Sequence, residues 1–76
     1  MKVRLLAFAY TAQQAGFSEC VIESDATDTP RQLLQRAAPA VATEGLRVAV
    51  DCEYHDWDAP IGAASEVALI PPVSGG

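Results

Sequence analysis

Segments of alternating hydrophobicity surround a single stretch of helical periodicity, and this pattern limits the folds open to the chain. Residues 2–10 alternate between two faces, as expected for a strand, whose successive side chains point in opposite directions. Residues 19–23 predict a second strand that would pair with the first as a hairpin. The segment 11–16 is interpreted as the connection, in which residues 12–15 could form a helical turn.

A helix is predicted to begin at Asp28-Thr29-Pro30. Thr or Asp can cap the free backbone N–H groups, and Pro suits the first helical position. Apolar residues then recur at helical spacing: Leu33, Leu34, Ala37, Ala38 and Val41. Pro39 disfavours helical geometry at Ala38, so we expect the helix to end or kink there.

Further strands are predicted in the second half of the chain. Residues 46–51 alternate, 53–58 are expected to pair back on them, and 66–70 form the last strand. The double proline at 71–72 ends that strand, because proline cannot donate to a ladder. The order of elements favours an α+β fold of the β-grasp (ubiquitin-like) type, in which one mixed sheet curls over one main helix. Alternation alone leaves the strand pairing open.

The length of 76 residues allows one domain with one core, assigned to residues 1–72, and a tail over 73–76. Five basic residues against ten acidic ones give a net charge of −5. The basic residues are scattered and form no patch for a row of phosphates, so nucleic acid is not an expected partner. A basic protein surface suits this acidic balance better.

Cysteine use and hydropathy favour a cytoplasmic protein. Cys20 and Cys52 form neither a CxxC pair nor a disulfide framework, and we interpret them as reduced thiols in or near the core. No apolar run approaches the ~18 residues that a membrane span needs. The start of the chain superficially resembles a signal peptide, but its alternation is that of a core strand.

The tail carries the strongest candidate for chemistry. Val73-Ser74-Gly75-Gly76 follows Pro71-Pro72. A free carboxylate is a poor electrophile, but activation as an acyl-adenylate would let sulfur displace AMP and leave a thiocarboxylate on Gly76. Glycine lacks Cβ and so can thread a narrow channel. Four residues beyond the prolines extend at most ~14 Å, enough to reach a partner's active site.

Three segments resemble the MoaD family, the small subunit of molybdopterin synthase within the ThiS/MoaD-like ubiquitin-like superfamily: KVRLLAFA, RVAVDCEYHDWDAPI and, most specifically, EVALIPPVSGG. The family usually has Asn at the position of Asp51 and Gly-Asp at Ala64-Ser65; both positions are expected to be structural. The resemblance implies a thiocarboxylate formed at Gly76 by an E1-like (MoeB-like) adenylating enzyme that uses ATP. It also implies entry of the tail into a MoaE-like large subunit, in a heterotetramer, and sulfur donation to precursor pterin. No cofactor or metal is expected on the chain itself.

An apolar patch is predicted on the sheet face opposite the helix, formed by Leu6, Phe8, Ala49, Ala68 and Ile70. Such a patch with a polar rim indicates a protein-binding site. Together with the segment 71–75, its residues Leu6, Phe8, Ala68 and Ile70 are the predicted partner-binding residues.

Other functions stay open. The chain could carry sulfur for another product, such as thiazole or a thiolated nucleoside, or act as a ubiquitin-like modifier that joins target lysines. Lys2 is its only lysine, which disfavours self-conjugation. Cys52, Glu53, His55, Asp56 and Asp58 are metal-ligand types whose spacing matches no common zinc or calcium loop. We interpret that segment as a solvated hairpin and Trp57 as a cap on the core edge.

Overall fold

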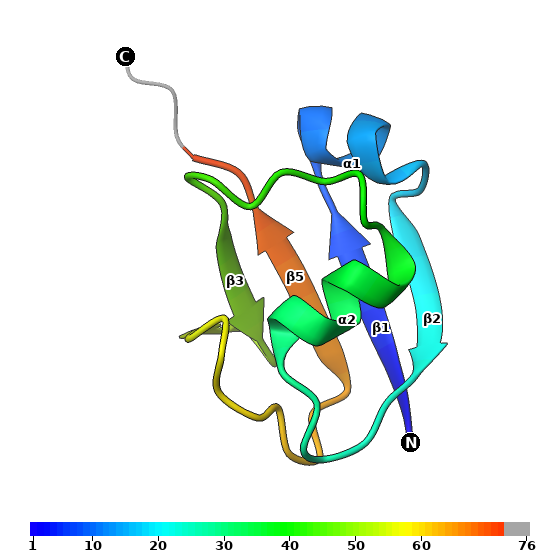
Figure 1. Cartoon of the computed structure of the whole chain (residues 1–76), viewed down its shortest axis with the longest axis vertical. Coiled ribbons are helices and arrows are strands. Elements are labelled where there is room, and N and C mark those ends of the chain that lie inside the picture. Colours follow the sequence, from blue (N-terminus) through cyan, green and yellow to red (C-terminus); the bar gives the residue numbers. More distant parts are fainter. Residues whose placement is uncertain (73–76) are drawn as a thin grey trace.

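The computed structural model describes residues 1–72, so the predicted tail at 73–76 lies outside the described residues (Figure 1). Five strands and two helices follow in the order β1 (Lys2–Ala7), α1 (Ala9–Ala15), β2 (Glu19–Glu23), α2 (Pro30–Ala37), β3 (Arg47–Val50), β4 (Glu53–His55) and β5 (Glu66–Ile70).

The strands form one sheet in the order β2-β1-β5-β3-β4. The central pair, β1 and β5, is parallel, and the other three pairs are antiparallel. Helix α2 crosses one face of this sheet, whereas α1 lies at the end of the sheet toward which β1 and β5 run (Figure 1). A mixed sheet covered by one main helix is the β-grasp arrangement that the order of elements predicts.

Helix α2 begins and ends where the sequence predicts. Thr29 is the N-cap: its side chain accepts a hydrogen bond from the Gln32 N–H at 3.2 Å, while the Gln32 side chain accepts one from the Thr29 N–H at 2.9 Å. This reciprocal capping box satisfies N–H groups that the first turn leaves unpaired. The helix stops at Ala37, with Ala38 as C-cap just before Pro39.

The core lies between α2 and the inner face of the sheet. Leu33 and Leu34 of α2 are buried against alternate residues of the three central strands: Val3, Leu5, Ala7, Val48, Val50, Val67 and Leu69. These residues share one face of the sheet, because a strand register that buries one side chain also buries its neighbours two positions away. Trp57 packs against this core, and its Nε1 donates to the Leu46 carbonyl at 3.0 Å.

The predicted strand over residues 2–10 is wrong in its last part. It stops at Ala7, Phe8 is the N-cap of α1, and the interpretation of 11–16 as a connection misses most of this helix. The chain turns at Ala9, which has φ of 53°, and the helix ends at Gly16 with φ of 86°. Thr11 is fully buried, while Ala12 and Ala15 pack on the core. The packing of Thr11, Ala12 and Ala15 favours this helix over the longer strand that the alternation predicts.

The placement of Cys52 in or near the core is also wrong. Cys20 and Cys52 are free cysteines, as expected, but Cys52 is exposed. It shares the two-residue turn between β3 and β4 with Asp51, and both residues have positive φ, 48° for Asp51 and 71° for Cys52. Tight two-residue hairpin loops favour this left-handed backbone, because its twist matches that of the strands. The turn therefore carries Cys52 away from the core.

Within residues 1–72, no helix is long and apolar enough to cross a membrane.

Candidate functional site: an apolar groove beside the end of the last strand

The face of the sheet opposite α2 carries a continuous row of side chains. In the strand register Leu6 lies beside Ala68, Ala68 beside Ala49, and Ala49 beside Tyr54, so the row crosses four strands from β1 to β4. Two alanines at its centre, flanked by a leucine and a tyrosine, leave a depression between taller side chains.

This depression is a groove of about 360 Å³, lined by Leu6, Phe8, Ala49, Cys52, Tyr54, Glu66, Ala68 and Ile70. Five of these eight residues are the predicted apolar patch. Phe8 and Tyr54 expose 46% and 64% of their surface. Exposed aromatic side chains beside an apolar floor are typical of the centre of a protein-binding surface.

One end of the groove is polar. Arg4 Nη2 donates to Glu66 Oε1 at 2.9 Å between adjacent positions of β1 and β5. The Cys52 thiol lies 3.9 Å from the other Glu66 oxygen. Asp51 holds the nearby turn, because its Oδ1 accepts the N–H groups of Ser65 and Glu66, each at 3.0 Å. The groove therefore has a polar end and, toward Phe8 and Ile70, an apolar end.

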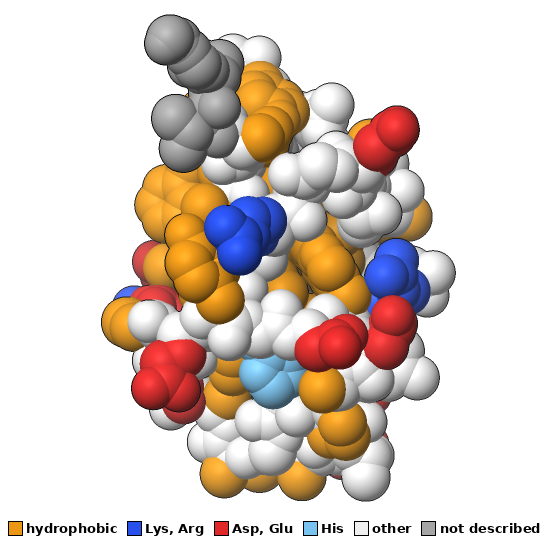
Figure 2. Space-filling view, turned by 90° about the vertical axis from the view of Figure 1, so that its left-hand side faces the viewer, with side chains coloured by type: hydrophobic (Ala, Val, Ile, Leu, Met, Phe, Trp, Pro, Cys, Tyr) orange, Lys and Arg blue, Asp and Glu red, His pale blue; other side chains and the backbone are white. Residues whose placement is uncertain are grey.

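The apolar end adjoins the point where the chain leaves β5. Ile70, the last residue of that strand, lies opposite Arg47 of β3. The Arg47 guanidinium carbon stacks over the Tyr54 ring, 4.2 Å from its centroid. Figure 2 shows the edge of the molecule near β3 and β4, where a basic side chain lies among hydrophobic ones. Tyr54 thus forms a wall of the groove, and the Arg47 cation stacks on that ring just outside the groove, opposite the end of β5.

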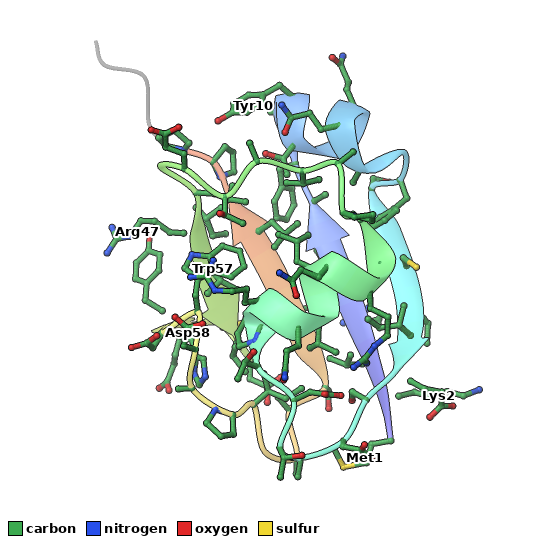
Figure 3. The ribbon with its side chains drawn as sticks, viewed as in Figure 1. Met1, Lys2, Tyr10, Arg47, Trp57 and Asp58 are labelled. Carbon is green, nitrogen blue, oxygen red and sulfur yellow. The ribbon has the colours of Figure 1, made fainter. Side chains whose placement is uncertain are left out.

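A second hollow, of about 340 Å³, lies on the same edge and includes Arg31, Arg47, Tyr54, His55 and Trp57 in its lining. Arg31 stacks over Trp57 at 5.8 Å and pairs with Asp58 at 2.8 Å. Figure 3 shows Arg47, Trp57 and Asp58 along the β3 side of the molecule. The hydrogen bond and charge of Arg31 lower the pKa of the Asp58 carboxyl. The charged groups of Arg31 and Asp58 in this hollow therefore already bind each other.

Side chains of metal-ligand type in the segment 52–58 make local hydrogen bonds to the backbone that follows β4. His55 Nε2 donates to the Ala59 carbonyl at 3.0 Å, and Asp56 Oδ1 accepts the Asp58 N–H at 2.8 Å. In the part of the chain that the structure describes, no group of three or more His, Cys, Asp or Glu side chains could hold a metal ion.

The structure brings together four of the predicted partner-binding residues, namely Leu6, Phe8, Ala68 and Ile70, in one groove. Pro71 and Pro72 follow directly. Val73, Ser74, Gly75 and Gly76 lie outside the described residues. Tyr54 and Cys52 also line the groove, although the alternation did not predict them there. A two-residue turn at 51–52 puts Tyr54 opposite Ala49, so the register of the predicted hairpin could have revealed Tyr54.

The model of the ThiS family matches residues 5–76. The chain belongs to the ThiS family. This confirms the resemblance to the ThiS/MoaD-like group. The match takes in both the groove and the last four residues of this ThiS-family chain. No curated protein matches it at a significant level.

Solved structures with the same fold support the β-grasp assignment. SAMP1 from Haloferax volcanii is 26% identical over 100% of each chain, with a TM-score of 0.78. The putative molybdopterin converting factor, subunit 1, from Pyrococcus furiosus is 24% identical, with a TM-score of 0.74 over 96% of this chain and 99% of that one. The small archaeal modifier protein 1 from Methanosarcina acetivorans is 17% identical, with a TM-score of 0.69 over 99% and 96%. The last two likenesses show the fold alone.

Proposed function

We propose that this ThiS-family chain is a sulfur carrier that reacts at the α-carboxylate of Gly76 and docks through the apolar groove. The observation that carries the proposal is the position of the groove. Its apolar end, at Phe8 and Ile70, lies next to the residues that lead into the Gly-Gly tail. An enzyme seated on the groove would therefore be placed to receive the tail.

The chemistry requires two steps on the partner enzyme. The Gly76 carboxylate attacks the α-phosphate of ATP, which forms an acyl-adenylate and releases pyrophosphate. A hydrosulfide ion then adds to the carbonyl carbon, expels AMP and loses its proton, which leaves a thiocarboxylate. This chain contributes no catalytic side chain to either step; it contributes a terminus without a Cβ in the way and a surface that orients it.

The proposed partners are those that the resemblance to the MoaD family implies. An E1-like (MoeB-like) adenylating enzyme would bind the groove first, and a MoaE-like large subunit of molybdopterin synthase would bind it next, in a heterotetramer. The two complexes would use one surface in turn, because the tail can enter only one active site at a time. Within the synthase, the thiocarboxylate would donate its sulfur to precursor pterin. Both steps belong in the cytoplasm, where ATP is available and exposed Cys52 stays reduced.

A ubiquitin-like modifier is the second candidate, because SAMP1 from Haloferax volcanii matches the full length of this chain. Carrier and modifier share the adenylation step and differ in the acceptor, which is sulfur for one and a lysine amine for the other. A sulfur carrier for thiazole or a thiolated nucleoside would share both the adenylate and the thiocarboxylate.

Intact mass spectrometry of the protein from its native host tests the proposal. A mass gain equal to the exchange of one oxygen for sulfur supports a carrier, whereas a ladder of larger conjugates supports a modifier. Loss of molybdopterin on deletion of the gene, with thiazole and thiolated nucleosides unchanged, would assign the acceptor.

The terminus is tested separately. Deletion of Gly76 should abolish sulfur loading, while the circular dichroism spectrum stays that of the full chain. One residue added after Gly76 should block loading unless it is removed. Full loading of the unprocessed extended chain would contradict the proposed mechanism.

A further inference from the structure

The sheet has an open edge at β2, on the side remote from β3 and β4 (Figure 1). Within residues 1–72, no strand pairs with the outer side of β2, and its only strand partner is β1. A strand edge presents unpaired N–H and C=O groups, which can pair with an extended segment of another chain.

The register shows which backbone groups point outward. Ala7 N–H donates to the Ser18 carbonyl at 2.9 Å, and Ser24 N–H donates to the Met1 carbonyl at 2.6 Å. In an antiparallel ladder, alternate residues bond to the same neighbour, so the even-numbered residues 18–24 face β1. The N–H and C=O groups of Glu19, Val21 and Glu23 therefore point away from the sheet. Within residues 1–72, two of these carbonyls have a side-chain donor: Arg36 Nη1 donates to the Glu23 carbonyl at 3.1 Å, and the Cys20 thiol lies 4.0 Å from the Val21 carbonyl.

The side chains of this edge form a pattern. Glu19, Val21 and Glu23 alternate with the half-buried Cys20 and Ile22, and all three are exposed, Val21 by 54%. The Glu23 carboxylate pairs with the Met1 ammonium at 3.6 Å, and its side chain stays 73% exposed, so this ion pair is weak. The edge thus shows acidic, apolar and acidic side chains on one face.

The negative charges of Glu19 and Glu23 determine which kind of strand can pair with this edge. A second copy paired antiparallel about Val21 would set Glu19 against Glu23, and like charges directly opposite each other are destabilising. A strand with basic residues two positions either side of an apolar residue would instead oppose each glutamate with a cation. Its intervening residues would cover Cys20 and Ile22, and so should be apolar.

We propose that the outer edge of β2 is a second docking site, which binds an extended basic–apolar–apolar–apolar–basic segment of a partner protein by strand addition. The groove lies on β1, β5, β3 and β4, whereas this site uses the outward backbone of β2. A partner could therefore hold the chain at β2 while the tail occupies an enzyme. Binding at this edge does not depend on the chemistry at Gly76.

Titration of the ¹⁵N-labelled full chain with an acetylated, amidated peptide Lys-Val-Ile-Val-Lys tests the site. Amide exchange of Glu19, Val21 and Glu23 should slow by at least tenfold at saturation, and that of Cys20 and Ile22 should change little. The peptide Glu-Val-Ile-Val-Glu should bind at least tenfold more weakly. Equal binding of both peptides, no binding of the basic one, or shifts confined to Leu6, Ala49 and Ala68 would overturn the proposal. Protection of the same amides without peptide, together with dimer formation, would overturn it in favour of a second copy.

A matched pair of variants isolates the backbone contact. Val21→Pro removes an outward N–H without removing a bond to β1, so it should abolish binding, whereas Val21→Thr keeps the N–H and should bind within threefold of the wild type. If Val21→Pro does not fold, the basic peptide N-methylated at its central residue serves instead and should not bind. Unchanged binding in either test would overturn the proposal.

Discussion

The Arg47 guanidinium lies over the Tyr54 ring, 4.2 Å from its centroid, and this pair joins β3 to β4 beside the end of β5. Within residues 1–72, Arg47 is the one arginine without a carboxylate partner, since Arg4, Arg31 and Arg36 pair with Glu66, Asp58 and Asp28. The other three arginines are thus held by carboxylates, whereas Arg47 is held by the Tyr54 ring, next to the groove.

Removal of this stack should reveal a small but measurable coupling. In a double-mutant cycle with Arg47→Met and Tyr54→Leu, we expect a coupling energy of about 0.5–1 kcal/mol, as for an exposed cation–π pair. Urea unfolding monitored by circular dichroism measures it. The Arg31–Trp57 pair is wider, at 5.8 Å, so a cycle with Arg31→Met and Trp57→Leu should give a smaller coupling energy. Additive effects of Arg47→Met and Tyr54→Leu would show that the stack is energetically silent.

Phe8→Asp tests the groove without endangering the fold. Phe8 is the N-cap of α1 and makes no side-chain cap hydrogen bond, whereas Asp is a favourable N-cap residue. We therefore expect an intact domain whose affinity for the adenylating enzyme and the large subunit falls about tenfold or more. Calorimetric titration measures this change. Tyr10→Asp is the control, because Tyr10 is 49% exposed but does not line the groove. Equal losses of affinity in both variants would show that docking does not depend on the groove.

Thr11→Val should stabilise the protein. Thr11 is fully buried, and its Oγ1 makes no hydrogen bond in the structure. Replacement of an unsatisfied hydroxyl by a methyl group of similar size should raise the free energy of unfolding by about 1 kcal/mol. The same exchange at Thr29 removes the N-cap of α2 and should lower it by about 1 kcal/mol. A destabilised Thr11→Val would mean that the hydroxyl has a partner in solution.

Asp51 should tolerate Asn but not Ala. Its Oδ1 accepts two backbone N–H groups, an acceptor that Asn also provides, and its φ of 48° is one that Asn and Asp adopt more readily than Ala. Asp51→Asn should stay within about 0.5 kcal/mol of the wild type, while Asp51→Ala should lose about 2 kcal/mol. Denaturant midpoints decide between them. A large loss for Asn would show that the negative charge itself is needed.

Acid should weaken the contact between α2 and the loop before it. Hydrogen bonds from the Arg36 side chain and the Asp25 N–H hold the pKa of the Asp28 carboxyl below its ordinary value. A carboxyl with a depressed folded-state pKa stabilises the fold above its unfolded pKa, near 4, and loses that contribution as the pH falls through the folded pKa. Asp28→Asn should therefore be less stable than the wild type at pH 7, with a difference that shrinks below pH 4. Thermal unfolding from pH 2 to 7 measures this, and a difference that stays constant down to pH 2 would contradict the assignment.

Much of this protein follows from local pattern. The limits of β5, the cap and end of α2, and the alternation that buries Val3, Leu5, Val67 and Leu69 can be read from the sequence. Each depends on residues within a few positions of one another, such as Thr29 with Pro30 and Gln32. The apolar patch is predicted for the same reason, since period two assigns Leu6 and Ala68 to the face opposite the helix.

Contacts between distant segments decide the rest. Only tertiary packing shows that β1 and β5 pair in parallel, that residues 9–15 coil into α1, and that Tyr54 closes the groove beside Arg47. These contacts join segments that are far apart in the sequence and meet only when the chain folds. Alternation cannot reveal them, because it is the same for a strand at the edge or at the centre of a sheet. The sequence therefore shows which residue types each strand carries. The groove and the open edge of β2, in contrast, form only when the strands take their order in the sheet.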